Sequence, residues 1–331
     1  MHEAHAHSPS AADHSFLRRE LLERRAKLEA AAARSDKHQI VELLDAVDQT
    51  LGRMEQGSFG ICEVCEMPIE AERLVDDPLT RICLDCLSPS QRRALELDLS
   101  LASSIQRSLL PQQNFDVPGW EGFYHYEPHG AVSGDFCDVI RDGDETFILL
   151  GDISGKGVSA ALLMSHLSAI FRGLIGSGDP LVSIMERANR LFCAAVPSGS
   201  FATLVAARLR PDGEVELSNA GHVPPIVHNG CINRLPPDGV PLGLFCQSAY
   251  TSQQLRLDPG DRLVFVTDGL VESSDGNQVE YGIGAVASLV QSHPHLGPCD
   301  LAEHLVADAA RFRNGRPAED DTTLMVMRRT N

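Results

Sequence analysis

The stretch Gly151-Asp-Ile-Ser-Gly-Lys-Gly157 joins a short apolar run to a segment with helical periodicity. The run before it, Thr146-Phe-Ile-Leu-Leu150, is typical of a buried strand. Residues 158–174 repeat leucine and isoleucine at mostly helical spacing. Asp152 is therefore expected at a strand-to-loop corner, where glycines let the backbone turn. A carboxylate there can hold a cation, but Asp and Gly are also common turn residues, so both interpretations stay open.

The composition is that of a globular protein with about two domains. The chain has 331 residues, of which 43% are hydrophobic and 22% charged, and its net charge is −18. Residues 1–112 and 113–331 are both acidic. This disfavours a nucleic-acid-binding protein, because phosphate backbones are bound by basic side chains. Acids that bind divalent cations would explain part of the surplus after residue 113.

Segments that direct a chain to a membrane or out of the cell are not expected. No apolar run reaches the length of a membrane span, and the start lacks the apolar core of a secretory signal. The nine cysteines are an odd number in a chain without such a signal. We therefore expect a reducing compartment, with cysteine used for metal binding or packing and not for disulfides, and a cytoplasmic protein.

The beginning of the chain is predicted to be a tail followed by a helical hairpin. Residues 1–13 are polar and are expected to be disordered. Residues 14–57 show two segments with apolar residues three and four apart, interrupted at Ser35-Asp36. Two helices with a short connection favour an antiparallel hairpin, which could equally be a plain dimerising or spacer element.

Two CxxC motifs lie in the next segment, residues 58–88. They consist of Cys62 and Cys65, then Cys83 and Cys86, with seventeen residues between the pairs. Four thiolates complete a tetrahedral Zn²⁺ site with no open position, so the pattern predicts a structural zinc site. A redox-active pair would not need both motifs.

This segment resembles the DksA/TraR family of zinc-finger proteins. The matching residues are Phe59-Gly-Ile-Cys-Glu-Val-Cys65, Pro68-Ile-Glu-Ala-Glu-Arg-Leu74 and Cys83-Leu-Asp-Cys86. Full members enter the RNA polymerase secondary channel through acidic residues at the hairpin tip. Here the tip region, residues 30–36, has a single acid. The resemblance therefore implies the zinc fold more than polymerase binding, and a polymerase-binding transcription regulator remains an alternative function.

Residues 89–112 are predicted to be a linker helix. Residues 91–110 contain neither Gly nor Pro and carry a broad apolar stripe that Pro111 ends. The helix could form a coiled coil or pack on the following domain. Its position between the two domains makes it a candidate for carrying a signal from one to the other.

From residue 113 the chain alternates short strands with turns. Strands are expected at 122–127, 136–141, 146–150, 201–209, 214–218, 225–228, 252–257, 262–267 and 323–327. Helices are expected at 158–175, 181–196, 284–291 and 300–313. Consecutive strands joined by tight turns favour antiparallel sheets with helices outside. The predicted fold class is α+β, an α-β-β-α sandwich preceded by the hairpin and zinc finger.

Four acids stand beside small residues at the ends of apolar strands: Asp135, Asp152, Asp268 and Asp320. Each alone could be a turn acid. Together on one rim they would suit Mg²⁺ or Mn²⁺, which prefer oxygen ligands. Two such ions can activate a bridging water for attack on phosphorus, without a Cys or His nucleophile.

The whole of residues 113–331 resembles the SpoIIE-type branch of the protein phosphatase 2C family. The motifs, in family order, are Ser133-Gly-Asp-Phe-Cys-Asp138, Gly151-Asp-Ile-Ser-Gly-Lys-Gly157, Ser218-Asn-Ala-Gly-His-Val-Pro-Pro225, Pro241-Leu-Gly243, Thr267-Asp-Gly-Leu-Val-Glu272 and Asp320-Asp-Thr-Thr323. Ile105-Gln-Arg-Ser-Leu-Leu-Pro111 also matches the helix that precedes this domain in regulator-of-sigma-B-type phosphatases.

The resemblance implies a site of two Mn²⁺ or Mg²⁺ ions on these four acids and on the backbone carbonyl of Ile153. Asp138 and Asp321 would support the ligands or exchange roles with them. The family's general-acid His position is Ser154 here, and no Arg is evident for holding phosphate. His222 is typical of the family but could be structural. Lys156 could contact phosphate or simply cap its loop.

The implied function is a metal-dependent phosphoserine/phosphothreonine protein phosphatase. By resemblance, its substrate would be a phosphorylated STAS-domain antagonist of an anti-sigma factor in a partner-switching pathway. Because the hairpin and the linker helix could both dimerise, we also expect a homodimer. The alternatives are a non-catalytic docking module on a phosphatase fold and the polymerase regulator.

Overall fold

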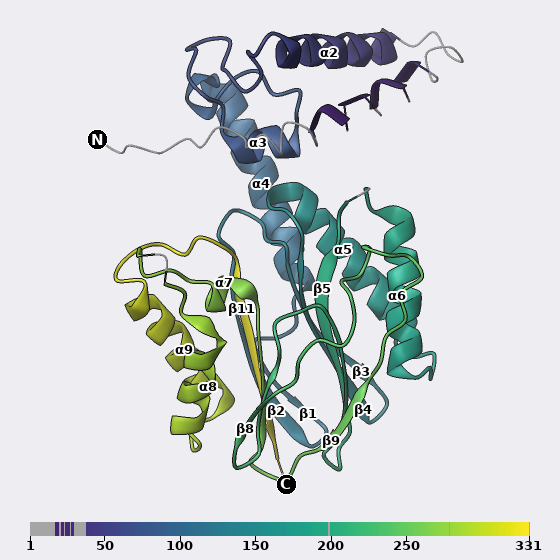
Figure 1. Ribbon diagram of the computed structural model, residues 1–331, viewed down its shortest axis with the longest axis vertical. Helices are drawn as coiled ribbons and strands as arrows, with labels where there is room; N and C mark the ends of the chain where they lie inside the picture. The colour runs from purple at the N-terminus through teal and green to yellow at the C-terminus, as the bar shows by residue number, and fades with distance from the viewer. Residues whose placement is uncertain are drawn as a thin grey trace. The chain divides into compact units, whose positions relative to one another are not determined.

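The computed structural model describes residues 17–19, 21–22, 24–26, 28–29, 38–197, 199–277 and 279–330. The chain divides into two compact units, 1–98 and 99–331, and the division falls within helix α4 (Pro89–Leu109) (Figure 1). The predicted disordered tail, residues 1–13, and the hairpin tip, residues 30–36, lie outside the described residues.

In the first unit, two helical stretches pack against each other. The described residues from 17 to 29 are helical, and α2 spans His38–Glu55. Leu21 packs with Val47 and Leu51 in one apolar cluster. The ion pairs Arg25–Asp48 (2.6 Å) and Arg18–Glu55 (3.7 Å) run in opposite chain order, so the two stretches are antiparallel.

The rest of the first unit is a small core around the cysteines. It contains α3 (Ala71–Asp76) and the 3₁₀ turn η1 (Leu84–Cys86). Leu17, Phe59, Ile69 and Leu74 bury their side chains together with Cys62 and Cys83. So small a core gains little from apolar burial alone, and domains of this size usually need a metal, disulfides or oligomerisation for stability.

The second unit contains two antiparallel sheets. One has the order β1 (Asn114–Val117), β2 (Trp120–Glu127), β11 (Thr322–Arg329), β10 (Arg262–Val266), β7 (Ile226–His228), β8 (Ile232–Arg234). The other has the order β3 (Asp135–Asp142), β4 (Glu145–Ile153), β5 (Ala202–Leu209), β6 (Glu214–Ala220), β9 (Gln253–Arg256). Strands β1 and β8 were not predicted, because they are short, partly exposed edge strands without an apolar alternation.

Two pairs of helices cover the outer faces of the sheets (Figure 1). Helices α5 (Gly157–Leu174) and α6 (Leu181–Ala195) share a core with β3, β4 and β5. Helices α8 (Gly282–Ser292) and α9 (Pro298–Phe312) share another core with β10 and β11. A short helix, α7 (Asp268–Val271), follows β10 directly. The predicted α-β-β-α sandwich of the α+β class is confirmed.

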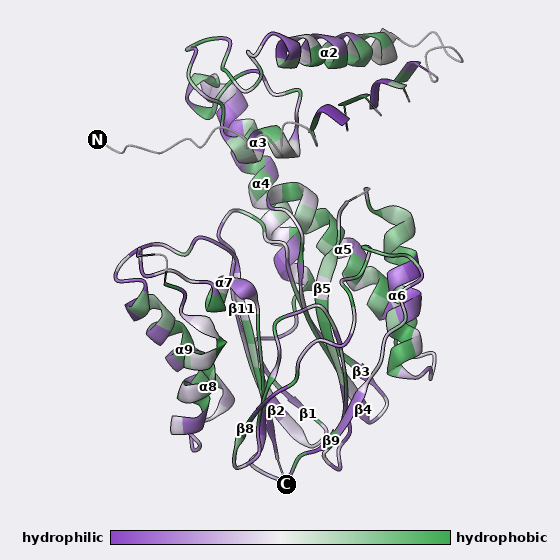
Figure 2. Ribbon diagram, in the orientation of Figure 1, coloured by the Kyte–Doolittle hydropathy of each residue, from purple (hydrophilic) through white to green (hydrophobic). Residues whose placement is uncertain are grey.

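The central strands are buried on both faces. In β4, Phe147 and Leu149 point to the α5/α6 core, whereas Ile148 and Leu150 point to the core between the sheets. Strands of this kind read as continuous apolar runs instead of alternating ones. Figure 2 shows apolar colour along such strands and a mixture of apolar and hydrophilic residues on α6.

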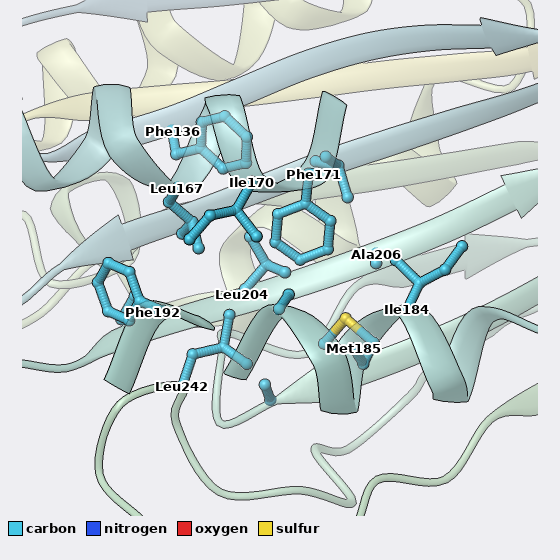
Figure 3. Close-up of a cluster of buried hydrophobic side chains, with 14 of the residues drawn as sticks. Phe136, Leu167, Ile170, Phe171, Ile184, Met185, Phe192, Leu204, Ala206 and Leu242 are labelled. Atoms are coloured by element: carbon cyan, nitrogen blue, oxygen red, sulfur yellow. The ribbon is translucent and has the colours of Figure 1, made fainter. Parts of the chain in front are cut away.

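Helix α5 is anchored by aromatic and aliphatic side chains. Phe171 and Leu167 lie against Phe136 of β3 and Phe192 of α6 in one buried cluster (Figure 3). By length and composition alone α5 is also apolar enough to span a membrane, although no such segment was expected from the sequence. Its packing in this cluster accounts for its apolar character.

One cysteine pair departs from the expectation that no disulfide forms. Cys193 of α6 is joined to Cys246 in the loop between β8 and β9, with their Cα atoms 5.5 Å apart. Asn189, one turn earlier on α6, hydrogen-bonds the same loop at Gly243 N (2.8 Å) and Phe245 O (2.8 Å). Cysteine counting could not find this pair, because folding brings together residues 53 positions apart.

Candidate active site and zinc site

Strand register brings two of the predicted acids side by side. Asp135 at the start of β3 is paired with Asp152 near the end of β4, and Asp152 is paired with Thr203 on β5. Directly paired residues project to the same face of a sheet. That face is the one that carries Leu150 into the core between the sheets. Asp135, Asp152 and Thr203 therefore point into the space between the two sheets, at one end of the sandwich.

The opposite sheet supplies the other two acids. Asp268 follows β10 at the start of α7, and Asp320 precedes β11. The charge of Asp268 and then that of Asp320 act on Asp152, and Asp320 also acts on Asp268. Asp152 in turn acts on Asp135, so each of the four acids interacts with at least one other.

Asp135 is the most enclosed of these acids, at 1% exposure. Its Oδ2 accepts hydrogen bonds from the hydroxyls of Thr267 (3.0 Å) and Thr323, which belong to the ends of β10 and β11. Its Oδ1 is buried without a hydrogen-bond partner. A buried carboxylate oxygen left unsatisfied is costly, and a bound cation would satisfy it. Both threonines lie within the quoted motifs, but their role was not predicted.

Burial and mutual repulsion shift the titration of the cluster. Burial, then the charges of Asp268 and Asp320, raise the pKa of Asp152 to about 8. Burial and then Asp152 raise the pKa of Asp135 well above its ordinary value, and burial and then Asp320 raise that of Asp268. Glu272 was quoted in a motif without a role, and its pKa is raised by burial and then by Asp268. Such a set of oxygen donors fits hard divalent cations, which would offset the repulsion.

Ile153 can reach this site only through its backbone. Its side chain is 1% exposed and packs in the α5/α6 core. Its carbonyl oxygen lies 3.1 Å from where a Cβ on Gly134 would be, and Asp152 Oδ1 lies 3.3 Å from that point. Glycine at 134 therefore keeps room beside both oxygens. This geometry is compatible with the predicted use of the Ile153 carbonyl, which stays a prediction.

Asp321 holds two backbone segments in place. Its Oδ1 accepts the N–H of His129 (2.7 Å) and its Oδ2 accepts that of Gly134 (2.9 Å). Its own carbonyl would lie 1.9 Å from a Cβ on Gly269, so only glycine fits in the Thr267-Asp-Gly turn. Asp321 thereby fixes the loop that leads into Asp135.

Asp138 lies on the other face of β3 from Asp135. Its carboxylate is fully buried and forms a two-pronged ion pair with Arg172 of α5, at 2.7 Å to Nε and 2.9 Å to the second nitrogen. Arg172 also donates to the carbonyl of Leu109 at the end of α4 (3.1 Å). The structure therefore places Asp138 as a link between β3, α5 and α4, away from the acids on the rim.

His222 lies beside Thr203, the residue that is paired with Asp152 on the neighbouring strand. Its Nδ1 is hydrogen-bonded to Thr203 Oγ1 at 2.8 Å. The Asn219 side chain accepts the N–H of His222 (2.8 Å) and donates to its carbonyl (3.1 Å), which shapes the turn. Burial lowers the pKa of His222 to about 4, so the ring is neutral at physiological pH. His222 therefore neighbours the acid cluster, with Thr203 between it and Asp152.

A residue that sequence analysis did not single out fixes the approach to Asp135. Gln106 of α4, 4% exposed, donates to the Ser133 carbonyl (2.6 Å) and accepts the Ser133 N–H (3.0 Å). The Ser133 hydroxyl in turn accepts the N–H of Asp135 (3.0 Å). Helix α4 is thus tied directly to the backbone of the acid cluster. The quoted stretch 105–111 contained Gln106, but only as part of a helix motif.

The four cysteines of the first unit gather as predicted. Their ligand atoms all lie within 4.8 Å of one another, a spacing that the acids of the second unit do not meet among the described residues. Burial opposes the thiolate of Cys62, but backbone N–H groups of Cys83 and Val64 (3.4 Å each) lower its pKa to about 6. The pKa of Cys83 is raised by burial, and that of Cys86 is raised by its hydrogen bond with Cys65. Thiolates are the form that binds zinc, so the arrangement fits a structural Zn²⁺ site.

Two antiparallel sheets between two helix pairs, with acids at one end, define a protein phosphatase 2C-type domain. The chain belongs to the SpoIIE family: the family model described as Stage II sporulation protein E (SpoIIE) matches residues 142–330. A second family model, the prokaryotic dksA/traR C4-type zinc finger, matches residues 57–92. Both resemblances noted in the sequence are confirmed.

Curated relatives share the phosphatase region. Phosphoserine phosphatase RsbU of Bacillus subtilis is 24% identical over 250 residues, 72% of this chain and 72% of RsbU. Protein IcfG of Synechocystis is 29% identical over 217 residues, 56% of this chain and 34% of IcfG. The chain thus spans about a third of IcfG.

Solved structures share the fold. The SiaA-PP2C domain of Pseudomonas aeruginosa has a TM-score of 0.64 at 21% identity, covering 73% of this chain and 99% of that domain. The RsbU and RsbW domains of Rv1364c from Mycobacterium tuberculosis give a TM-score of 0.56 at 29% identity, covering 67% of this chain and 62% of that one.

Proposed function

We propose that this chain is a phosphoserine/phosphothreonine protein phosphatase that depends on two Mn²⁺ or Mg²⁺ ions. The observation that carries the proposal is the arrangement of Asp135, Asp152, Asp268 and Asp320 at one end of the sandwich, with a buried, unpartnered oxygen on Asp135. When bound, the two ions would supply a water of lowered pKa and positive charge for the phosphoryl group.

The residues of the chain prepare this site before any substrate arrives. Thr267 and Thr323 orient Asp135 so that Oδ1 remains available. Asp321 positions the backbone at Gly134, next to the Ile153 carbonyl. Because these groups are buried and hydrogen-bonded, they lose little freedom on binding, which favours catalysis by preorganisation.

The test is hydrolysis of p-nitrophenyl phosphate and of a phosphoserine protein, with and without Mn²⁺. Activity should require the cation, and Asp268→Asn should reduce it by about a hundredfold or more, because a charged ligand is lost. Asp116→Asn, an exposed acid on β1, is the matched control and should keep full activity. Activity without added cation, or full activity in Asp268→Asn, would reject the proposal. A docking module without catalysis would bind partners but fail this assay.

The proposed substrate is a phosphorylated STAS-domain antagonist in a partner-switching pathway. Its support is the likeness to RsbU and RsbP, both named phosphoserine phosphatases, and to a protein that carries RsbU and RsbW domains on one chain. Release of phosphate from a phosphorylated STAS protein should be at least about tenfold faster than from a phosphoserine peptide, because a folded substrate adds contacts beyond the phosphate. Equal rates on the two substrates would argue against a dedicated STAS substrate.

We also propose that the protein is a homodimer, whereas its cytoplasmic location stays a prediction from the sequence. Helix α4 exposes Leu97 (64%), Leu101 (61%) and Ile105 (54%) four residues apart, so they form a stripe along the helix. An exposed apolar stripe with this spacing suits a second helix of the same kind. Light scattering of the purified chain measures the dimer directly.

A further inference from the structure

Lys156 differs from every other basic residue in the second unit. The chain has only three lysines, Lys27, Lys37 and Lys156, beside 25 arginines, so Lys156 is the single lysine after residue 37. It stands between Gly155 and Gly157, after β4 and directly before α5. Lysine carries a compact charge on a flexible four-carbon chain, whereas arginine is a planar fork suited to fixed two-pronged pairs. A lysine at this position is suited to exchanging one anionic partner for another, because its side chain is flexible.

The contact of Lys156 is with one of the four acids. Its Nζ lies 3.0 Å from Asp320 Oδ2 and donates to the Glu319 carbonyl at 3.1 Å. Both side chains of the ion pair are 46% exposed, so the pair is accessible to solvent. The charge of Lys156 also acts on Asp268, where it opposes the rise in pKa that burial and Asp320 cause. Lys156 is thus placed beside the acid cluster, with its side chain partly exposed to solvent.

The ion pair occupies an oxygen that the proposed cation site needs. Asp320 Oδ1 already accepts the backbone N–H of Asp321 (2.9 Å), and Oδ2 is the oxygen that pairs with Lys156. A divalent cation held by Asp320 would stand next to the ammonium, and like charges at such a distance repel. The lysine would then lose its partner and turn to the nearest other anion.

A phosphoryl group at this site would be that anion. The rim presents carboxylates, and Asp152, Asp268 and Glu272 would repel a phosphate dianion. No arginine was found in the sequence for this role. We propose that Lys156 is a phosphate-binding residue that exchanges partners, giving up its ion pair with Asp320 for the substrate's phosphoryl oxygens once Asp320 holds a cation. This inference rests on the proposed phosphatase function.

The alternative is that Lys156 only ties the loop at 319–320 to the start of α5. The two roles predict opposite effects of Lys156→Met on metal binding. If the lysine competes with the cation, its removal tightens Mn²⁺ binding. If it merely holds Asp320 in place, its removal weakens Mn²⁺ binding.

Calorimetry on the full chain, with its zinc retained, separates these roles. Mn²⁺ is titrated into the manganese- and magnesium-free protein, and orthophosphate into the Mn²⁺-loaded protein. We expect Lys156→Met to bind Mn²⁺ about three- to tenfold more tightly and orthophosphate at least about tenfold more weakly, since a charge-assisted hydrogen bond is lost. Lys156→Arg keeps the charge and should retain orthophosphate binding within about threefold. Fluorescence of Trp120, the single tryptophan, verifies that each variant is folded.

The rarity of lysine allows a second, direct measurement. Reductive ¹³C-methylation preserves the charge and yields NMR signals from three lysines and the chain's α-amine. The Lys156 signal is the one missing in Lys156→Arg. It should shift on addition of Mg²⁺, and shift again with orthophosphate only when Mg²⁺ is present.

The inference is overturned if Lys156→Met weakens Mn²⁺ binding or leaves orthophosphate binding unchanged, or if orthophosphate leaves the Lys156 signal in place. In those cases Mn²⁺-dependent hydrolysis by the unmodified chain would still stand, so the proposed function survives. If the unmodified chain neither binds Mn²⁺ nor hydrolyses p-nitrophenyl phosphate, both proposals fail together.

Discussion

Replacing Asp152 by Asn should stabilise the second unit when no manganese or magnesium is bound. Burial and the neighbouring acids raise the pKa of Asp152 from 3.8 to about 8. The folded protein therefore retains a proton that the unfolded chain releases, so its stability falls as the pH rises from about 4 to about 8. One pKa unit corresponds to about 1.4 kcal/mol, so the cost for Asp152 at pH 8 is at most about 5 kcal/mol. Asparagine removes the ionisation but still buries a polar amide, and we expect a gain of about 2–4 kcal/mol.

Urea unfolding, followed by tryptophan fluorescence, measures this gain in stability for the second unit alone. Trp120 is the single tryptophan, is 1% exposed and lies in the core between the two sheets. The measurement is made at pH 8 and pH 5 in buffer without manganese or magnesium, with zinc left in place. The variant should unfold at higher urea than the unmodified chain at pH 8. The difference should shrink at pH 5, which lies much closer to 3.8, the pKa of Asp152 in the unfolded chain.

Two comparisons make the result decisive. Asp116→Asn removes an exposed acid from the same unit and should leave the urea midpoint unchanged at both pH values. With saturating Mn²⁺ the order should reverse, because a cation that binds only the folded state stabilises the unmodified chain, which keeps the ligand. If Asp152→Asn and the unmodified chain unfold at the same urea concentration at pH 8, the repulsion argument is wrong.

Three further outcomes are expected. Gln106→Ala leaves the buried backbone groups of Ser133 without partners and should lower the free energy of unfolding by about 1–3 kcal/mol, measured by Trp120 fluorescence. Reducing agent should destabilise the second unit by up to about 4 kcal/mol, because the disulfide closes a loop of 53 residues, and Cys193→Ser should lose this dependence. Leu101→Glu places a charge in the exposed stripe of α4 and should convert the proposed dimer to a monomer in light scattering, while urea unfolding at matched low concentration stays the same.

Much of the fold could be read from local patterns. Apolar runs marked the central strands, since strands buried on both faces carry hydrophobic residues at consecutive positions. Helical spacing marked α5, α6, α8 and α9 within a few residues of their observed bounds. Edge strands β1 and β8 escaped prediction because exposed, short strands need no apolar pattern.

The acid site could be predicted only in part from the sequence. The four acids stood out because each follows or precedes an apolar strand beside a small residue. The hydroxyls that orient Asp135 did not, because Thr267 and Thr323 are 132 and 188 residues away along the chain. The contacts of Asp138 could not be predicted from the sequence either. It lies three residues from Asp135, but strand alternation turns it to the opposite face, where it pairs with Arg172 of α5.

The sequence by itself determined the residue types and their local spacing: the two CxxC pairs, the glycine-rich corner after β4, and acids at strand ends. The tertiary structure alone decided which of those groups meet. Local interactions do not favour collecting like charges, so the acid cluster forms because the packing of two sheets outweighs the repulsion. The same packing sets Lys156 against Asp320, decides that Gln106 holds the backbone at Ser133, and joins Cys193 to Cys246.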